Sequence, residues 1–266
     1  MVRRLRLDAE LVRRQLARSR EQAGELIEAG RVQVRGTVAT KAATGVEQDT
    51  PIRVVADDDV PGYASRGGHK LAGALAGFAT LQVAGRRCLD AGASTGGFTD
   101  VLLRHGAREV VAVDVGYGQL VWALQNDPRV VVRDRTNVRT LTPDQIGGPA
   151  DLTVADLSFI SLGLVLPALA ACTVTDLVPM VKPQFEVGRQ RLGRGGVVRE
   201  PELRAEAVLA VAGAALELGW GTAGVARSPL PGPSGNVEFF LWLRQDAGPA
   251  DQAAVAAACA DAGEGS

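Results

Sequence analysis

Seven short apolar segments in the second part of the chain alternate with stretches of helical spacing, and this alternation constrains the fold most. The segments lie at residues 88–89, 110–113, 130–132, 152–155, 177–181, 221–225 and 237–243. Strands that alternate with helices are typical of a parallel, doubly wound sheet. We therefore predict an α/β, Rossmann-like fold with a seven-stranded, mostly parallel sheet that the last strand closes.

The composition agrees with such a sheet and offers little for metal chemistry. Hydrophobic residues make up 46% of the chain and aromatic residues 4%, so the core consists mainly of Ala, Val and Leu, as suits a sheet covered on both faces. Cys88, Cys172 and Cys259 are too widely spaced for a disulfide framework or a zinc site. With two histidines in the chain, we predict no metal.

The first apolar segment runs into a glycine-rich turn, Arg87-Cys-Leu-Asp-Ala-Gly-Ala-Ser-Thr-Gly-Gly-Phe-Thr99. Its spacing differs from the dinucleotide pattern, and no Lys-Ser or Lys-Thr pair follows to form a phosphate loop. Glycines let backbone N–H groups approach a ligand closely, and a carboxylate at the strand end can neutralise a cationic amine. These features favour an S-adenosylmethionine site over a plain tight turn. The residues proposed for it are Asp90, Gly92, Ser94, Gly96, Gly97 and Phe98.

Charged residues follow several of the predicted strands. Asp90, Asp114, Asp134, Asp156 and Lys182 all fall at carboxyl ends of strands, where open α/β sheets bind their ligands. Asp114 is placed to accept hydrogen bonds from the ribose of the cofactor, or else to cap the next helix. Asp134 can reach the adenine, or else pair with a neighbouring arginine. We predict that Asp114 and Asp134 belong to the cofactor site.

The first 41 residues are basic, with ten basic side chains against five acidic ones. Helical spacing, a capping box from Ser19 to Gln22, and strand candidates at 32–34, 37–38 and 52–55 predict a small α+β domain over residues 1–59. A solvated basic helix face is the plain interpretation of its arginines. However, the run from Arg6-Leu-Asp to Val34 and Gly36 resembles the alpha-L RNA-binding module. That resemblance implies phosphate contacts by a set of basic residues: Arg4, Arg6, Arg18, Arg20, Arg31 and Lys41.

Four motifs carry charged residues that suit methyl transfer: Ser65-Arg-Gly-Gly-His-Lys-Leu71, Asp156-Leu-Ser, Val181-Lys-Pro-Gln-Phe185 and Asn236-Val-Glu-Phe-Phe240. In this order they resemble the FtsJ-like (RrmJ-like) ribose methyltransferases. Together with the basic domain, nearly the whole chain resembles the TlyA family of rRNA 2′-O-methyltransferases, often labelled haemolysin A. The resemblance implies that Lys182 is the base that takes the proton of the ribose hydroxyl. Lys70 then stabilises the oxyanion, and Asp156 and Glu238 orient the two lysines.

The resemblance implies an enzyme that uses S-adenosylmethionine to methylate cytidine 2′-hydroxyls in ribosomal RNA of the 30S and 50S subunits. The alternatives are an RNA-binding or ribosome-assembly protein without turnover, and a membrane-active haemolysin. An uncharged run at 157–175 raises the possibility of a membrane span, but its Ser, Thr and Pro residues favour a strand end, a loop and a crossover helix. The charges near the start of the chain do not fit a signal peptide, so we expect a cytoplasmic protein.

We further predict a linker at 60–64, a methyltransferase domain at 65–245 and a flexible tail at 246–266. Family members carry an Arg- and Trp-containing segment where this chain has Pro61-Gly-Tyr-Ala64, which leaves open a linker role in cofactor binding. The loop 188–196 combines arginines with glycines and either closes over RNA or is merely solvated. Tyr63 and Trp122 either stack on bases or pack. The exact target nucleotides and the oligomeric state do not follow from the sequence.

Overall fold

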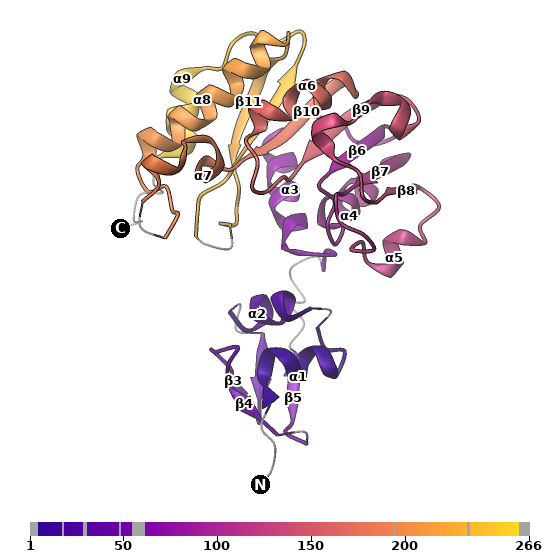
Figure 1. Ribbon diagram of the computed structural model, residues 1–266, viewed down its shortest axis with the longest axis vertical. Helices are drawn as coiled ribbons and strands as arrows, with labels where there is room; N and C mark the ends of the chain where they lie inside the picture. Colours follow the sequence, from indigo (N-terminus) through magenta and orange to yellow (C-terminus); the bar gives the residue numbers. More distant parts are fainter. Residues whose placement is uncertain are drawn as a thin grey trace. The chain divides into compact units, whose positions relative to one another are not determined.

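The chain folds into two units, which are described separately (Figure 1). The computed structural model describes residues 5–17, 19–28, 31–47, 49–54, 62–193, 195–232 and 235–260. Its contacts divide the chain into Met1–Gly62, the N-terminal unit, and Tyr63–Ser266, the C-terminal unit. Of the predicted linker 60–64, residues 60 and 61 lie outside the described residues.

The N-terminal unit combines two helices with two small sheets. Its elements are β1 (Leu5–Arg6), α1 (Leu7–Arg13), α2 (Arg20–Glu28), β2 (Val32–Val34), β3 (Thr37–Val38), β4 (Gly45–Val46) and β5 (Ile52–Val54). Strands β3, β2 and β5 form an antiparallel sheet, and β1 pairs with β4. The Ser19 hydroxyl accepts a hydrogen bond from the Gln22 N–H at 3.1 Å, so α2 begins at the predicted cap. The pair β1–β4 escaped prediction because two residues show no periodicity.

The C-terminal unit contains the predicted seven-stranded sheet. Its strands are β6 (Arg87–Ala91), β7 (Glu109–Val113), β8 (Val130–Arg133), β9 (Ala150–Ala155), β10 (Thr173–Val181), β11 (Gly221–Arg227) and β12 (Phe239–Arg244). They lie in the order β11-β12-β10-β9-β6-β7-β8. The strand β12 does not close an edge but lies between β10 and β11, antiparallel to both. Its start therefore lies at the same edge of the sheet as the carboxyl ends of the parallel strands.

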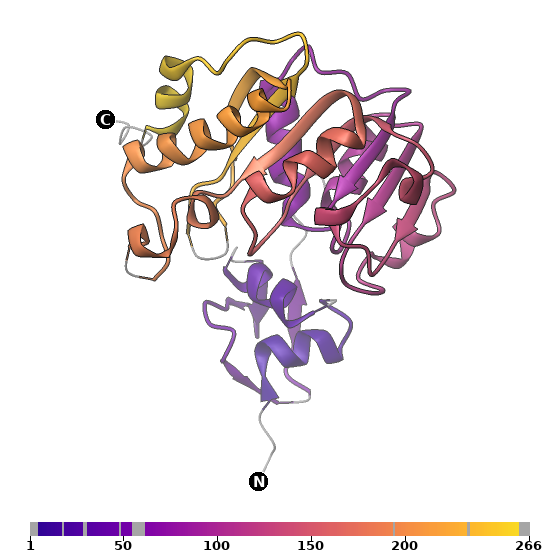
Figure 2. The same cartoon turned by 45° about the horizontal axis from the view of Figure 1, so that its top comes forward.

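Helices cover both faces of this sheet (Figure 2). The helices α3 (Arg66–Gly77), α4 (Gly97–Arg104) and α5 (Trp122–Gln125) pack on one face. The other face is covered by α6 (Leu166–Ala171), α8 (Pro201–Glu217) and α9 (Gln252–Cys259), and α7 (Pro183–Glu186) follows β10. Short 3₁₀ helices lie at η1 (Val138–Thr140), η2 (Pro143–Ile146), η3 (Leu162–Leu164) and η4 (Arg189–Arg191).

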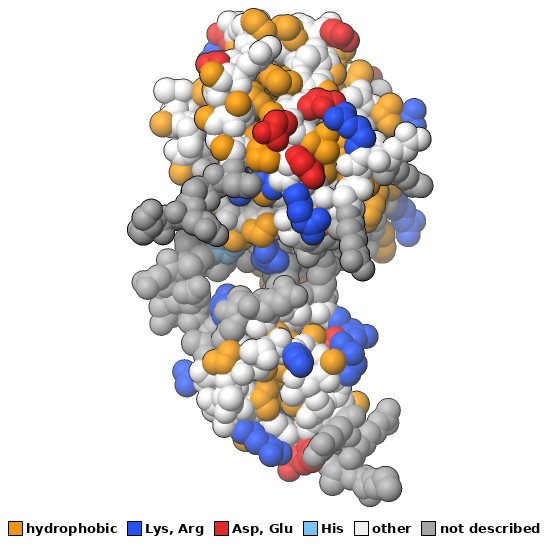
Figure 3. Space-filling view, turned by 90° about the vertical axis from the view of Figure 1, so that its left-hand side faces the viewer, with side chains coloured by type: hydrophobic (Ala, Val, Ile, Leu, Met, Phe, Trp, Pro, Cys, Tyr) orange, Lys and Arg blue, Asp and Glu red, His pale blue; other side chains and the backbone are white. Residues whose placement is uncertain are grey.

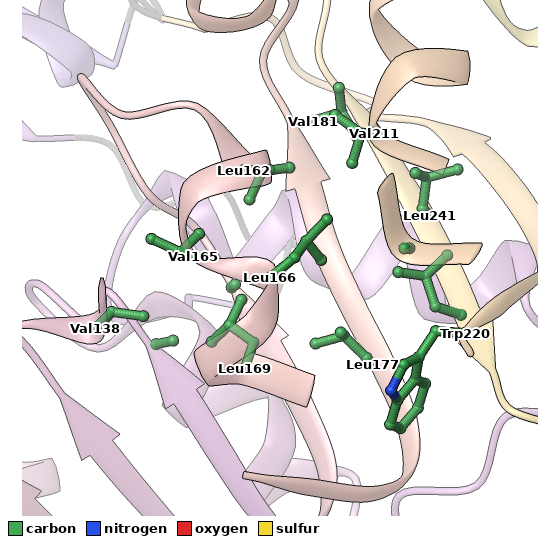
Figure 4. Close-up of a cluster of buried hydrophobic side chains, with 14 of the residues drawn as sticks. Val138, Leu162, Val165, Leu166, Leu169, Leu177, Val181, Val211, Trp220 and Leu241 are labelled. Atoms are coloured by element: carbon green, nitrogen blue, oxygen red, sulfur yellow. The ribbon is translucent and has the colours of Figure 1, made fainter. Parts of the chain in front are cut away.

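Aliphatic side chains fill the core, as the composition predicts. Figure 4 shows Leu166 and Leu169 of α6 beside Leu177 of β10, with Leu241 of β12 nearby, and all four are at most 1% exposed. Each such side chain stabilises the fold by about 1.5–3 kcal/mol relative to its exposed state. This packing holds β9, β10 and β12 firmly enough to fix the side chains at their ends.

The uncharged run at 157–175 forms a loop, η3, α6 and the first residues of β10, as the sequence favours. Within the described residues, no helix combines the length and the apolar character that a bilayer span requires.

The predicted flexible tail is wrong for much of its length, because α9 is folded and packed. The Asp251 side chain caps α9 by accepting hydrogen bonds from the N–H groups of Ala253 and Ala254. Val255 and Cys259 are buried against the core, at 1% and 0% exposure. The Ala-rich sequence hid this helix, since two buried side chains are too few to show a period. Residues 261–266 lie outside the described part.

Candidate active site

Lys182 lies directly after β10 and contacts two polar side chains. Its Nζ is 2.6 Å from Oδ1 of Asp156, and it donates a hydrogen bond to Oγ of Ser158 at 2.8 Å. Lys182 is 7% exposed. Asp156 follows β9, which pairs in parallel with β10, so two neighbouring strand ends bring the ammonium and the carboxylate together.

A second lysine, Lys70, reaches the same edge from α3. Its Nζ lies 2.5 Å from Oε2 of Glu238, whose side chain is 1% exposed. Glu238 immediately precedes β12, and the register pairs Val181 with Phe239. In an antiparallel pair this register sets Lys182 opposite Glu238. The structure thus brings all four predicted catalytic residues to one edge as two ion pairs, Lys182 with Asp156 and Lys70 with Glu238.

A cavity of about 550 Å³ opens beside these pairs. Lys182 and Glu238 line it, together with Ser158, Phe159 and residues of the loop after α7. Lys70 is not among the described residues that line it. Lys182 is therefore the lysine that lines the cavity directly, while Lys70 contacts the carboxylate of Glu238, which also lines it.

The residue type at these two positions is informative in its own right. The chain has 29 basic residues, of which three are lysines, namely Lys41, Lys70 and Lys182. Arginine stays protonated in proteins, whereas lysine can release and accept a proton. Two of the three lysines therefore lie at this edge of the sheet, in a chain that otherwise uses arginine.

The glycine-rich turn connects β6 to α4 in a backbone conformation that demands glycine. Gly92 has a φ of +88°, and a Cβ there would lie 2.4 Å from the carbonyl oxygen of Asp156. Ser94 and Gly96 also have positive φ values. The turn therefore passes directly beside the residue that pairs with Lys182, so a ligand in the turn lies close to the lysine.

Two residues predicted to bind the cofactor have packing roles in the structure. A Cβ on Gly97 would lie 2.3 Å from Oγ of Ser65, so Gly97 allows α4 to approach the start of α3. The ring of Phe98 is 3% exposed and lies 5.9 Å from that of Phe240, in the core. The side chain of Phe98 is therefore turned away from any ligand, and only its backbone can serve one.

Asp90 is more deeply buried than the sequence predicts. It is 0% exposed and accepts a hydrogen bond from Oγ1 of Thr99 at 2.7 Å, while its Oδ1 has no hydrogen-bond donor among the described residues. Burial raises the pKa of Asp90 to about 7, against the lowering effect of the Thr99 hydrogen bond. Asp90 therefore favours its protonated form more than an exposed aspartate does.

Asp114 and Asp134 offer accessible carboxylates beside the turn. Asp114 accepts hydrogen bonds from the N–H groups of Ser94 and Gly116 at 2.8 and 2.7 Å, and Asp134 accepts one from Gly118 at 2.9 Å. Both residues are partly exposed. Each carboxylate oxygen has a further lone pair, so both aspartates can accept hydrogen bonds from hydroxyl or amino groups. The backbone N–H groups that they bind hold both carboxylates in place beside the turn.

In the N-terminal unit, two of the predicted RNA-binding arginines converge on one carboxylate. Arg6 and Arg20 both donate to Asp8, with Nη2 atoms 3.1 and 2.8 Å from its Oδ2. Their side chains remain 52% and 61% exposed. These ion pairs hold the pKa of Asp8 low, at about 2. Asp8 therefore fixes two exposed guanidinium groups side by side.

The other predicted RNA contacts are less constrained. Lys41 is exposed and Arg31 is partly buried. Arg4 and Arg18 lie outside the described residues. The sequence did not predict a second cluster, in which Arg13 and Arg14 both bind the buried Glu10. Arg14 also donates to the carbonyls of Thr50 and Glu47, so this second cluster braces the unit.

The sequence did not single out two polar residues, Ser158 and Asn236, that lie beside the four charged residues. The hydroxyl of Ser158 accepts the hydrogen bond from the Lys182 ammonium. Asn236 is 2% exposed and binds the loop after α7. Both stand inside motifs that the sequence singles out, two residues from Asp156 and from Glu238. Their short spacing in sequence from a charged residue was the signal that could have identified them.

The aromatic residues divide between packing and exposure. Tyr63 packs edge-on to His69 at 5.0 Å, with the Arg104 guanidinium 4.8 Å from its ring centre. Trp122 is 78% exposed. Phe159, which no sequence argument selected, is 91% exposed at a φ of +64° and lines the cavity. The packing interpretation therefore holds for Tyr63 but not for Trp122.

The described residues contain no group of three or more His, Cys, Asp or Glu side chains arranged to hold a metal ion. Cys88, Cys172 and Cys259 are separate, buried thiols, and burial raises the pKa of Cys88 to about 12. They serve as small apolar side chains.

Comparison with known proteins agrees with this geometry. The FtsJ-like methyltransferase family matches residues 63–245, and the S4 domain matches residues 5–52. The chain is 65% identical to the 16S/23S rRNA (cytidine-2′-O)-methyltransferase TlyA of Mycobacterium tuberculosis over 92% of its own length and 91% of that protein. It is 35% identical to Hemolysin A of Brachyspira hyodysenteriae, over 89% and 98% of the two chains. A solved structure of a hemolysin candidate from Streptococcus thermophilus superposes with a TM-score of 0.76 at 38% identity, covering 97% and 96%.

Proposed function

Because the chain belongs to the FtsJ-like methyltransferase family, we propose that it transfers a methyl group from S-adenosylmethionine to the 2′-hydroxyl of cytidine in ribosomal RNA of both subunits. The observation that carries the proposal is the pair of buried lysine–carboxylate contacts beside a cavity, Lys182 with Asp156 and Lys70 with Glu238. A relative that is 65% identical bears this activity in its name.

The reaction needs a proton acceptor next to the attacking oxygen, since a ribose hydroxyl is a very weak acid. Lys182 fits this role because it lines the cavity and can accept a proton when neutral. Asp156 and Ser158 hold its Nζ from two sides. Fixing the base within reach of the hydroxyl supplies the alignment that methyl transfer requires.

Lys70 fits a supporting role. Its ammonium is held by the buried carboxylate of Glu238, which prevents its side chain from swinging away. A fixed positive charge stabilises negative charge that develops on the ribose oxygen. Glu238 in turn lines the cavity beside Lys182, so the charges of the second ion pair lie near the group that reacts.

S-adenosylmethionine supplies an activated methyl group on a sulfonium sulfur. We assign its binding to the turn at Gly92, Ser94 and Gly96, with Asp114 and Asp134 accepting from its adenosyl part. The positive φ values of the turn and the partly exposed carboxylates support this assignment. Gly97 and Phe98 contribute through the position of α4, and Asp90 through the support that it gives to the turn.

The N-terminal unit then docks the enzyme on folded RNA. Arg6, Arg20, Arg31 and Lys41 are assigned to phosphate contacts, along with Arg4 and Arg18. The exposed guanidinium groups that Asp8 holds side by side support this role, as does the S4 domain match. Phosphate contacts position a protein on RNA without reading its sequence. A ribosomal substrate implies that the protein acts in the cytoplasm.

The test is transfer of tritiated methyl from S-adenosylmethionine to unmodified 30S and 50S subunits, followed by separation of the 16S and 23S rRNA. The proposal expects label in both RNAs. Label in one of them would restrict the substrate, and no label from a folded protein that binds the cofactor would favour RNA binding without turnover. A membrane-active role predicts release of dye from vesicles instead, for which no described element provides support.

A further inference from the structure

Asn236 lines the cavity beside Glu238, the residue that holds Lys70. It is 2% exposed and lies two positions before Glu238. Its Oδ1 accepts a hydrogen bond from the N–H of Val198 at 2.9 Å, and its Nδ2 donates one to the carbonyl of Gly196 at 3.0 Å. One buried amide therefore satisfies a donor and an acceptor of the chain after α7.

The segment that Asn236 holds forms a wall of the cavity. We call residues 188–198 the cavity loop. Gly188, Leu192, Gly195 and Gly196 line the cavity together with Lys182 and Glu238. At its other end Arg191 forms a bidentate ion pair with Glu206 of α8, with one contact of 2.6 Å. Figure 3, which views the C-terminal unit from the side of α8 and α9, shows acidic and basic side chains gathered on this face.

The backbone of Asn236 also supports the turn that packs on Glu238. Its carbonyl accepts a hydrogen bond from Gly232 at 2.9 Å. A Cβ on Gly232 would lie 2.6 Å from Oε1 of Glu238, so the turn touches the carboxylate directly. The carbonyl of Glu238 accepts from the N–H of Ser228 at 2.9 Å. Asn236 thus joins two structures, the cavity loop through its side chain and the Glu238 turn through its backbone.

We propose that Asn236 is a positioning residue. It connects the cavity loop to the turn that holds Glu238, and so keeps the wall of the cavity at a fixed position relative to the two ion pairs. The hydrogen bonds of the Asn236 side chain fix the position of the cavity loop, and the hydrogen bond of its backbone carbonyl fixes the position of the turn that holds Glu238. Loss of the side chain frees the wall while the Lys70–Glu238 contact remains. The proposal rests on the proposed function in one respect, because it takes the cavity to be the site of the RNA substrate.

The test compares wild type with Asn236→Ala in the full-length protein. Trypsin cleavage after Arg189, Arg191 and Arg194, followed by mass spectrometry, reports opening of the cavity loop. We expect cleavage there to become about tenfold faster, as loss of hydrogen bonds from a buried group implies. Steady-state methyl transfer to ribosomal subunits should show a KM about tenfold higher with a smaller change in kcat. The affinity for S-adenosylhomocysteine, measured by calorimetry, should remain unchanged.

Ser228→Ala is the matched control. Ser228 is also buried and belongs to the same turn, but its hydroxyl donates to the carbonyl of Leu230 and not to the cavity loop. We expect this variant to be cleaved in the loop at the wild-type rate. Asn236→Asp serves if Asn236→Ala does not fold. It keeps an acceptor for Val198 and loses the donor to Gly196, so its cavity loop should be cleaved faster than that of the wild type.

Equal loop cleavage in wild type and Asn236→Ala would overturn the proposal, as would an equal rise in Ser228→Ala. Faster cleavage with an unchanged KM would also overturn it, because the loop would then be no part of the substrate site. If the wild-type protein methylates neither subunit, the proposed function fails, and the cleavage rates still decide whether Asn236 holds the loop.

Discussion

Lys70 and Glu238 are 168 residues apart in sequence, and their side chains meet at 2.5 Å. The contact joins α3, the first helix of the C-terminal unit, to the segment that leads into β12. Both side chains are at most 9% exposed. A buried pair of this kind depends on both partners, because either charge alone lacks the water that would stabilise it.

This dependence predicts strong coupling between the two positions. Glu238→Gln leaves the Lys70 ammonium buried without a carboxylate, and we expect it to lower the free energy of unfolding by about 3 kcal/mol. Lys70→Met combined with Glu238→Gln should recover at least half of that loss. Urea unfolding of both single variants and the double variant measures the coupling. Additive effects in the double variant would show that the pair contributes nothing as a pair.

The buried carboxyl of Asp90 predicts a pH dependence of stability. Burial raises its pKa to about 7 from an ordinary value of 3.8. Between these values the folded protein keeps a proton that the unfolded chain loses, so stability falls as the pH rises from about 4 to 7 and then levels off. Asp90→Asn removes this penalty.

Thermal unfolding at pH 5 and pH 8 measures the effect. We expect the Tm of Asp90→Asn, relative to wild type, to be higher at pH 8 than at pH 5 by roughly 3 °C or more. A Tm difference that stays constant between the two pH values would mean that Asp90 is already ionised in the folded protein at pH 5.

Much of the C-terminal fold was predictable because the signal is local. Apolar runs such as those of β7 and β9 are short, continuous and followed by a carboxylate, which marks both the strand and its end. The insertion of β12 between β10 and β11 was not predictable, since it depends on pairing between distant segments. The helix α9 was missed because its burial depends on two side chains, Val255 and Cys259. Their burial follows from packing against α8 and β11, which the sequence does not reveal.

The site shows the same division. Motifs identified the four charged residues, but their meeting at one edge follows from strand pairing. The parallel pairing of β9 with β10 brings Asp156 to Lys182, and Val181 opposite Phe239 brings Glu238 beside Lys182. The packing roles of Gly97 and Phe98 could not be predicted, because a glycine that permits helix packing and one that faces a ligand look alike in sequence. The deep burial of Asp90 was equally hidden, because it depends on the α4 side chains above it.

The arginines of the N-terminal unit predict a difference between two basic clusters. Arg20→Ala removes one of the exposed guanidinium groups that Asp8 holds, and should weaken binding to ribosomal RNA and reduce the salt slope by about 1. Arg13→Ala is the matched control, because Arg13 forms the same kind of ion pair, with the buried Glu10, but is not among the residues assigned to phosphate contacts. Filter binding of 50S subunits over a range of KCl concentrations measures both. Equal losses of RNA affinity in the two variants would mean that the Asp8 cluster has no special role in RNA binding.

The cap of α9 predicts a local effect on stability. Asp251→Ala removes the side chain that accepts from Ala253 and Ala254, and such a loss costs about 1 kcal/mol. Amide hydrogen exchange in α9 should therefore become about fivefold faster, while Asp251→Ser should restore most of the protection. Unchanged exchange in Asp251→Ala would mean that α9 is held by its packing alone.

The central claim is that Lys182 takes the proton from a cytidine 2′-hydroxyl, and the most direct measurement compares wild type with Lys182→Arg. Arginine keeps the positive charge beside Asp156 but cannot act as a base. After reaction with S-adenosylmethionine and unmodified subunits, the RNA is digested to nucleosides and analysed by mass spectrometry. We expect 2′-O-methylcytidine from the wild type and at least a ~100-fold lower rate from Lys182→Arg, with S-adenosylhomocysteine binding retained. Methylation on a base, or wild-type rates from Lys182→Arg, would contradict the account.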